Sequence, residues 1–383
     1  MKKLAIIGSG PAGITAAISA SRFAGQDVEI HLFEEKDALC KSILATGNGR
    51  CNFSNIVIDV DKYHNSNFVE EFNSHKQAGE SVCEILINLG LEITTNEAGL
   101  MFPASMKASS VREVLLDALD GTNVIVHLNE EAHYEECFQG FDLGIIASGH
   151  HTFYITTDWS FYEKKLCPIR IHEDVSVADN VRSKVMLTLL RDNEAIFEEC
   201  GEVQFRKYGI SGIVTFNASR YAKRGDVIQL DFTEPCLIEG DKKRHFRRRF
   251  DRLWESTNPY SLVPNTFFKG FLHDNVAKLI IERLKDKNSF EELYNSITKF
   301  DLKVEGLLED DKLFQVCRGG ILVNRVNPTT LKVNFSDEWA YPCDIFACGE
   351  ALDVDGPCGG YNLTWAFESG WRAGRCAANE LKE

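Results

Sequence analysis

This sequence of 383 residues lacks the features that mark several large classes of protein. No apolar run approaches the roughly 20 residues that a membrane-spanning helix needs, so we expect no membrane partner. The 12 cysteines form no C-x-x-C pair and do not lie near clustered histidines, which argues against a metal site or a redox disulfide. Scattered cysteines in a chain of this length are typical of reduced thiols, and the sequence therefore predicts a soluble, cytoplasmic protein.

Positive charge is also scarce, because 42 Lys and Arg stand against 57 Asp and Glu, for a net charge of −15. Such a field repels phosphate backbones, so we expect a small-molecule substrate and no nucleic-acid partner. One exception is the basic run at residues 242–249. We interpret it as a solvated helix face, with docking of a phosphorylated cosubstrate as the alternative. The sequence does not indicate an oligomeric state.

The first 35 residues contain the pattern of a dinucleotide-binding βαβ unit. An apolar run at 3–7 precedes three glycines in G-x-G-x-x-G spacing, an Ala-rich helical stretch to about 23 and a second apolar run at 28–33. The glycines allow a tight turn, close approach of a pyrophosphate and close helix packing, and the acid that follows is placed to bind a ribose. An ordinary glycine turn does not account for that acid. The candidate residues are Gly8, Gly10, Pro11, Ala12, Gly13, Glu34 and Glu35.

A second polar, glycine-rich segment lies at residues 46–55. Its glycines and asparagines suit neither a helix nor a strand. Such a loop can hold a phosphate or the polar edge of a flavin, with Arg50 as the anion partner, and a polar turn held by Asx hydrogen bonds is an equal alternative. The candidate residues are Thr46, Gly47, Asn48, Gly49, Arg50, Cys51 and Asn52.

A third glycine-rich segment follows the apolar run at 345–347 and opens a predicted helix over about 364–381. A strand ending in Gly-Glu puts a carboxylate near a ribityl chain, and the helix start aims backbone N–H groups at the N1/O2 edge of a flavin ring. A glycine turn before a surface helix does not explain so dense a run. The candidate residues are Gly349, Glu350, Gly359, Gly360, Tyr361 and Asn362.

Together these segments resemble the YhiN/BaiN-type FAD-dependent oxidoreductases, also described as aminoacetone oxidase-like flavoproteins. The resemblance rests on residues 8–13, 44–52, 101–103, 208–212 and 349–363 and covers nearly the whole chain. It implies that the first glycine turn holds the FAD pyrophosphate, that Glu34 binds the adenosine ribose and that Ala132 lies beside the adenine. Two segments depart from the family pattern, at 40–42 and at 147–159, where glycines are lost. Ser148 and Gly149 remain cofactor candidates, and we expect FAD binding to persist with an altered approach to the flavin.

The resemblance implies an α/β fold of the glutathione-reductase type, with a Rossmann-like FAD-binding domain, an inserted β-rich domain and a helical cap. The expected boundaries are 1–167 and 336–383 for the first, 168–240 and 306–335 for the second, and 241–305 for the cap. Short β-like runs at 185–190, 203–205, 213–216 and 227–232 support the β-rich domain. Apolar residues at helical spacing between 271 and 284 support the cap.

The function predicted is that of an FAD-dependent oxidoreductase in which the flavin mediates hydride transfer from NADH or NADPH to a small organic acceptor or dioxygen. No second glycine fingerprint marks a nicotinamide domain, so a nicotinamide donor would dock transiently. No catalytic acid or base can be named. Two alternatives stay open: an NAD-dependent dehydrogenase that uses the first fingerprint, and a flavin-binding protein without turnover, such as a sensor or degenerate paralogue.

Overall fold

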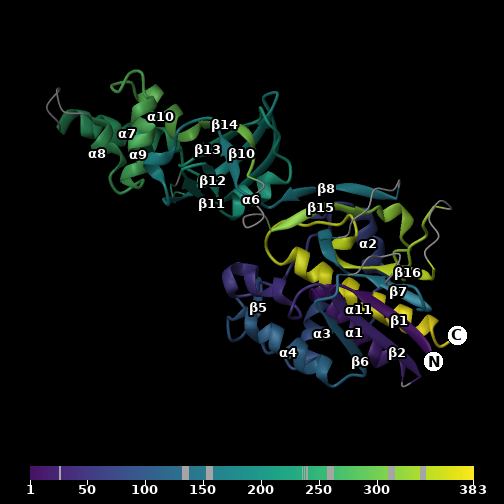
Figure 1. Cartoon of the computed structure of the whole chain (residues 1–383). Helices are drawn as coiled ribbons and strands as arrows, with labels where there is room; N and C mark the ends of the chain where they lie inside the picture. Colours follow the sequence, from purple (N-terminus) through teal and green to yellow (C-terminus); the bar gives the residue numbers. More distant parts are fainter. Residues whose placement is uncertain are drawn as a thin grey trace. The chain divides into compact units, whose positions relative to one another are not determined.

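The chain forms two compact units in the computed structural model (Figure 1). Unit 1 comprises Met1–Glu163 and Val316–Glu383, and unit 2 comprises Lys164–Gln315. The expected α/β architecture with a β-rich insertion is confirmed, although residues 316–335 cluster with unit 1 rather than with the β-rich insertion. The structure describes residues 1–25, 27–131, 138–151, 158–234, 236, 238, 240–256, 263–308, 315–336 and 342–383.

Unit 1 is built on a parallel five-stranded sheet with the strand order β16-β7-β1-β2-β6. Its central strands are buried on both faces, which is why they read as continuous apolar runs. Leu4 on β1 pairs with Ile30 on β2 and with Leu143 on β7. The strands are β1 (Lys2–Ile7), β2 (Val28–Glu34), β6 (Val124–Leu128), β7 (Leu143–Ile146) and β16 (Asp344–Ala347).

Five α-helices lie in the described part of unit 1, and the first and the last of them pack directly against each other. A Cβ on Gly370 or Gly374 of α11 would come within 2.2 Å or 2.1 Å of a backbone oxygen of α1, so the two backbones touch. The N- and C-terminal parts of the chain therefore form one layer. The helices are α1 (Pro11–Ala24), α2 (Ser66–Ser74), α3 (Val82–Asn88), α4 (Ala108–Asp120) and α11 (Tyr361–Glu380).

Smaller elements complete unit 1. An antiparallel sheet joins β3 (Ser54–Asn55), β5 (Leu100–Pro103) and β4 (Ile93–Thr95), and a two-stranded sheet joins β8 (Trp159–Lys165) to β15 (Val316–Ile321). The short 3-10 helices are η1 (Lys41–Gly49), η2 (Val60–Lys62), η3 (Gly149–His151), η5 (Val323–Arg325) and η6 (Gly349–Ala351).

Unit 2 contains a closed barrel with the strand order β10-β11-β12-β9-β14-β13. The strand expected at 213–216 is wrong, because this segment begins helix α6 (Ile213–Ser219). Gly212, at φ +104, turns the chain out of β12 and lets the helix start. The strands are β9 (Ile169–Ile171), β10 (Arg182–Arg191), β11 (Glu194–Arg206), β12 (Gly209–Ser211), β13 (Val227–Asp231) and β14 (Phe300–Leu307), with η4 (Ser176–Ala178) between the first two.

The helical segment expected as a cap shares one hydrophobic core with the barrel. Phe246, Ile280 and Leu293 belong to the same buried cluster as Leu187 and Ile228 of the barrel strands. Strand β14 follows the helices directly and returns the chain to the barrel. Residues 241–305 are therefore not a separate compact unit. The helices are α7 (Lys242–Ser256), α8 (Val263–Phe268), α9 (Asp274–Arg283) and α10 (Phe290–Thr298).

Within the described residues, no helix is both long and apolar enough to cross a bilayer. The same residues contain no group of three or more His, Cys, Asp or Glu side chains placed to hold a metal ion.

Candidate functional site

The turn between β1 and α1 needs its three glycines for different reasons. Gly8 has φ +95, and a Cβ there would lie 2.6 Å from the Ala147 carbonyl oxygen. A Cβ on Gly13 would lie 1.8 Å from the Gly8 oxygen, so both glycines are required by the packing of the protein itself. Gly10 differs: its φ of −62° suits any residue, and a Cβ there would come no closer than 3.8 Å to Ser42 Oγ. Nothing within the described chain explains why position 10 is glycine.

The N-terminus of α1 is left without a cap. Gly10 is the N-cap residue and supplies no side chain, Pro11 occupies the first helical position and the first turn holds no acid. An uncapped helix start carries N–H donors and a partial positive charge, and it is a ready site for an anion.

Glu34, the acid at the end of β2, is buried beside this turn. Its carboxylate accepts hydrogen bonds from the Ser9 backbone N–H at 3.1 Å, from the Ser9 hydroxyl and from the Lys36 backbone N–H at 3.0 Å. Glu35 is exposed and forms an ion pair with Lys36 at 3.4 Å. The sequence prediction missed Ser9, whose position inside the G-x-G spacing was the available signal.

The second segment leaves η1 through three left-handed residues, Gly47, Asn48 and Gly49. Backbone bonds close the turn, because Arg50 N–H donates to the Gly47 oxygen at 3.2 Å and Cys51 N–H to the Thr46 oxygen at 3.0 Å. The Asn52 amide donates to the Ser54 and Met101 backbone oxygens at 2.8 and 3.0 Å, which ties the loop to β5. The Arg50 side chain is exposed and forms no ion pair with any described residue.

The third segment lies against the first. A Cβ on Gly349, at φ +65, would come within 2.7 Å of Ala12 Cβ at the start of α1. Gly349 N–H donates to Ser369 Oγ at 2.9 Å, and its oxygen accepts from Trp365 Nε1 at 3.0 Å. Both partners lie on α11, so that helix holds the end of β16 beside the α1 N-terminus.

The ends of β7 and β16 also meet. His150 Nδ1 lies 3.7 Å from Glu350 Oε2, and a Cβ on Gly149 would lie 4.0 Å from the same oxygen. Ser148 is adjacent to Gly8, because a Cβ added to Gly8 would lie 2.7 Å from Ser148 Cα. The carboxyl ends of β1, β7 and β16 therefore converge, as they do at the ligand-binding edge of open α/β sheets.

The start of α11 packs on the second segment. A Cβ on Gly360, at φ +93, would meet the Ser54 backbone at 2.4 Å, whereas one on Gly359 would approach nothing closer than Leu100 Cδ2 at 3.6 Å. The buried Tyr361 accepts a hydrogen bond from Tyr63 Oη at its carbonyl, 2.8 Å away. The Asn362 amide pairs with the backbone N–H and oxygen of Gly356 at 2.7 and 2.9 Å, so its side chain is already used to close this loop.

A charged cluster beside this loop was not predicted from the sequence. Arg318 Nε lies 2.6 Å from Asp355 Oδ1, and Asp353 Oδ1 accepts the Gly319 N–H at 3.0 Å. His64 Nε2 lies 3.5 Å from Asp353 Oδ1. In the sequence, the glycine pair of β15 next to Arg318 was the available signal of a closely packed strand. A Cβ on Gly319 would lie 2.4 Å from the Phe161 backbone oxygen, so the backbone of β8 approaches β15 closely beside this cluster.

Three buried thiols near these segments, Cys40, Cys51 and Cys348, are not reactive groups. Burial raises the pKa of Cys40 to about 12 and that of Cys51 to about 11, and it also raises the pKa of Cys348. A thiolate is the nucleophilic form, so these side chains stay protonated and inert at neutral pH.

Ala132 lies outside the described residues. In the segment that departs from the family pattern, Asp158 is buried and accepts hydrogen bonds from Ser336 N–H and Oγ at 2.9 and 2.8 Å, while Arg325 Nε lies 2.7 Å from its other oxygen. This acid therefore has a structural role.

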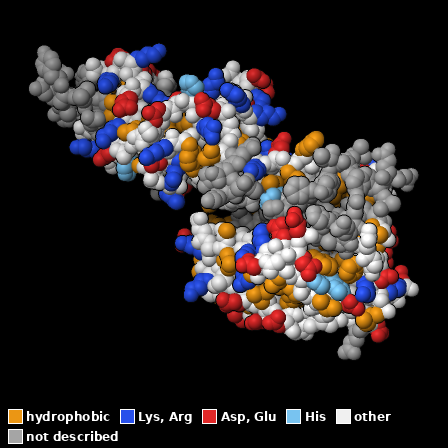
Figure 2. Space-filling view, viewed as in Figure 1, with side chains coloured by type: hydrophobic (Ala, Val, Ile, Leu, Met, Phe, Trp, Pro, Cys, Tyr) orange, Lys and Arg blue, Asp and Glu red, His pale blue; other side chains and the backbone are white. Residues whose placement is uncertain are grey.

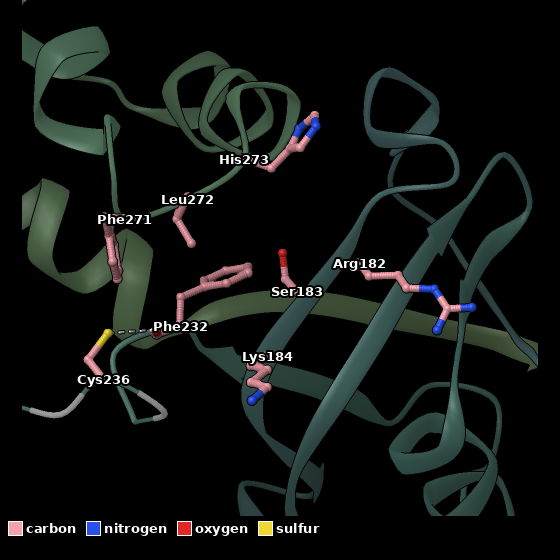
Figure 3. Close-up of a pocket in the computed structure, with 8 residues that line it drawn as sticks. All are labelled: Arg182, Ser183, Lys184, Phe232, Cys236, Phe271, Leu272 and His273. Atoms are coloured by element: carbon pink, nitrogen blue, oxygen red, sulfur yellow. Dashed lines mark hydrogen bonds between the residues drawn. The ribbon is translucent and has the colours of Figure 1, made fainter.

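A cavity of about 290 Å³ lies in unit 2, whereas every predicted cofactor residue belongs to unit 1 (Figure 3). Phe232, Phe271 and Leu272 supply apolar walls, and Arg182, Lys184 and His273 are polar groups of the lining. Arg182 is paired with Glu202 at 2.7 Å, and the His273 ring accepts the Asn275 N–H at 3.2 Å. Most of its polar groups are thus engaged within the protein.

Comparison with known proteins identifies relatives over the full length of the chain. Residues 2–153 match the HI0933-like protein Rossmann domain. The chain is 30% identical to the 3-dehydro-bile acid delta(4,6)-reductase of Clostridium scindens, with 99% of both chains covered. It is 22% identical to the ribosomal RNA dihydrouridine synthase of Escherichia coli, with 96% of this chain and 95% of the relative covered.

Similarity to solved structures is weaker. The 3-ketosteroid delta1-dehydrogenase from Sterolibacterium denitrificans superposes with a TM-score of 0.40 and 10% identity, over 99% of this chain and 100% of that chain.

Proposed function

Because the chain belongs to the HI0933-like, YhiN/BaiN-type family of FAD-dependent oxidoreductases, we propose that it catalyses two-electron transfer from NADH or NADPH to a small organic acceptor. When bound, FAD supplies the hydride chemistry through its isoalloxazine ring. The Clostridium scindens relative is by name a reductase of a 3-dehydro-bile acid, which favours an organic acceptor over dioxygen.

The unexplained glycine at position 10 is the observation that carries the proposal. The space beside Cα of Gly10 and the uncapped start of α1 suit a pyrophosphate. Its oxygens would accept hydrogen bonds from the backbone N–H groups of Gly10, Ala12 and Gly13. Glu34 would bind the adenosine ribose, with Ser9 holding its carboxylate in place. The residues present therefore fit the group.

The other end of the cofactor would meet the second and third segments. Gly359 leaves room in front of α11, and Gly360 caps that helix without a side chain, so its first N–H groups can stabilise negative charge on the ring. Arg50 would add a positive charge there, since its guanidinium has no ion-pair partner among the described residues. Glu350 would contact the ribityl chain from the end of β16.

The test is a visible spectrum of the purified protein and of a matched pair of variants. We expect absorbance at about 450 nm from a bound flavin. Gly10→Val should lose the absorbance but keep the melting temperature of the flavin-free wild-type protein, because a Cβ there meets no protein atom closer than 3.8 Å and would enter the ligand space. Gly121→Val, at an exposed glycine with φ −76°, is the control and should keep both the absorbance and the melting temperature of the flavin-bound protein. Full flavin occupancy in Gly10→Val would overturn the proposed site.

Anaerobic mixing with NADH and with NADPH tests the donor. Bleaching of the flavin by either donor supports turnover with a nicotinamide. If neither bleaches it, the protein is a flavin-binding protein without this activity. A colourless protein that binds NAD would instead be a nicotinamide-dependent dehydrogenase.

A further inference from the structure

Helix α7 of unit 2 carries the basic run, and most of its cations are engaged. Lys242 pairs with Glu234, Lys243 with Glu291 at 2.7 Å and Arg247 with Asp251 at 2.9 Å. These three charges are neutralised locally.

Arg249 is also committed. Its Nε donates to the Phe267 oxygen at 2.9 Å, and one of its terminal nitrogens donates to the Lys269 oxygen at 2.6 Å. Burial lowers the pKa of its guanidinium, which still remains charged at neutral pH.

Beside the paired Arg247, three further arginines of α7 are exposed: Arg244, Arg248 and Arg252. We call them the arginine stripe. None of them forms an ion pair with a residue in the described part of the chain. They recur every fourth position, so they lie on one face of the helix, about 6 Å apart along its axis.

The arginine stripe faces away from the core of unit 2. Phe246 and Phe250, which are buried, lie two positions from members of the stripe and therefore about half a turn away on the helix. Figure 2 shows basic side chains, interspersed with acidic ones, over the part of the molecule that carries α7–α10 in Figure 1.

The net negative charge of the protein does not belong to this unit. Residues 164–315 contain 26 Lys and Arg against 25 Asp and Glu, so the excess acid lies in unit 1. The sequence-based expectation of no nucleic-acid partner rested on the charge of the whole chain. Binding of a polyanion depends on the local potential, and that expectation therefore does not apply to α7.

We propose that the arginine stripe binds the phosphate backbone of a single-stranded nucleic acid. Arginine binds phosphate through two parallel hydrogen bonds, and three arginines in a line suit a linear polyanion better than one compact phosphate. An anionic membrane is the weaker alternative, because no large apolar side chain of α7 is exposed among those described to insert beside the charges. Contacts to phosphate carry no direct sequence information, so binding is independent of base sequence.

The experiment is fluorescence anisotropy of a labelled single-stranded RNA with the flavin-loaded full-length protein over a salt series. Three phosphate contacts predict a slope of about −2 for log K against log salt concentration. The variant R244Q/R248Q/R252Q should bind at least tenfold more weakly and show a slope near zero. The control K242Q/K243Q/R247Q removes the same formal charge from paired positions and should retain the wild-type slope.

Each outcome decides the proposal. An equal loss of RNA affinity in both triple variants would show a general charge effect and overturn the proposed role of the arginine stripe. The absence of RNA binding by the wild-type protein at low salt would also overturn it. Binding to phosphatidylserine vesicles but not to RNA would assign the stripe to a membrane instead. Flavin absorbance and melting temperature, unchanged in both variants, exclude misfolding as the cause.

Discussion

Gly370 on α11 packs against Ala12 on α1 so closely that a Cβ on Gly370 would lie 2.2 Å from the Ala12 carbonyl oxygen. Gly374 repeats the contact one turn later, 2.1 Å from the Ala16 oxygen. Ala12 also touches Gly349 at the end of β16. This contact between the two ends of the chain sets the distance between the first and third segments of the candidate site.

Gly370→Ala should therefore lower both stability and flavin retention. The methyl group must push α1 and α11 apart, which costs about 1–3 kcal/mol of unfolding free energy. Urea unfolding and the absorbance ratio of flavin to protein measure the two effects. Gly121→Ala, whose Cβ would meet nothing closer than 3.6 Å, is the control and should change stability by less than about 1 kcal/mol. Equal stability of the two variants would contradict this helix packing.

Glu34→Ala should weaken FAD binding. Loss of a charged acceptor for ribose hydroxyls costs about 1.5–3 kcal/mol, or roughly 10- to 100-fold in the dissociation constant. Titration of the apoprotein with FAD measures it. Glu35→Ala serves for comparison, because this exposed side chain is paired with Lys36, and its effect should be smaller. The assignment fails if the order is reversed.

The stability of Glu368→Gln relative to wild type should depend on pH with a defined sign. Burial raises the pKa of Glu368 above its ordinary value of 4.5, and Lys76 opposes that shift only in part. The folded state then binds the proton more tightly than the unfolded state, so wild-type stability falls as pH rises through this window. Glutamine cannot titrate, so the urea midpoint of the variant relative to that of wild type should be higher at pH 7 than at pH 5.

Glu84→Gln should show the opposite trend. A hydrogen bond from Ser81 lowers the pKa of Glu84, so its carboxylate stabilises the fold above its ordinary pKa and that contribution is lost as pH falls. The stability of the variant relative to wild type should therefore fall as pH rises. Parallel trends in the two variants would refute the environments assigned to these two acids.

Alkylation should separate the cysteines by burial. At pH 8, iodoacetamide should label the exposed Cys200 first and leave Cys40 and Cys51 unmodified in the native protein, because burial raises the pKa of both thiols. Peptide mass spectrometry reports the sites. Cys51→Ser should keep the rate of flavin reduction, and a large loss would give this thiol a chemical role that its environment does not support.

Local patterns were sufficient for part of this structure. The glycine spacing at 8–13 and the apolar runs around it predicted β1, α1 and β2, since turns and amphipathic periods are short-range properties. The same reasoning failed at 213–216, where a β-branched run forms the start of a helix. Whether that run is a strand or a helix depended on Gly212 and on packing against the barrel, which are tertiary effects.

The site divides in the same way. The sequence states directly which residues are glycine, acidic or basic, and this information was enough to select the three candidate segments. Only the tertiary structure decided that Ser9 holds Glu34, that Asn362 is used by Gly356, and which arginines of α7 keep a free charge. A hydrogen bond or ion pair depends on the distance between atoms far apart in sequence, and no local pattern encodes that distance.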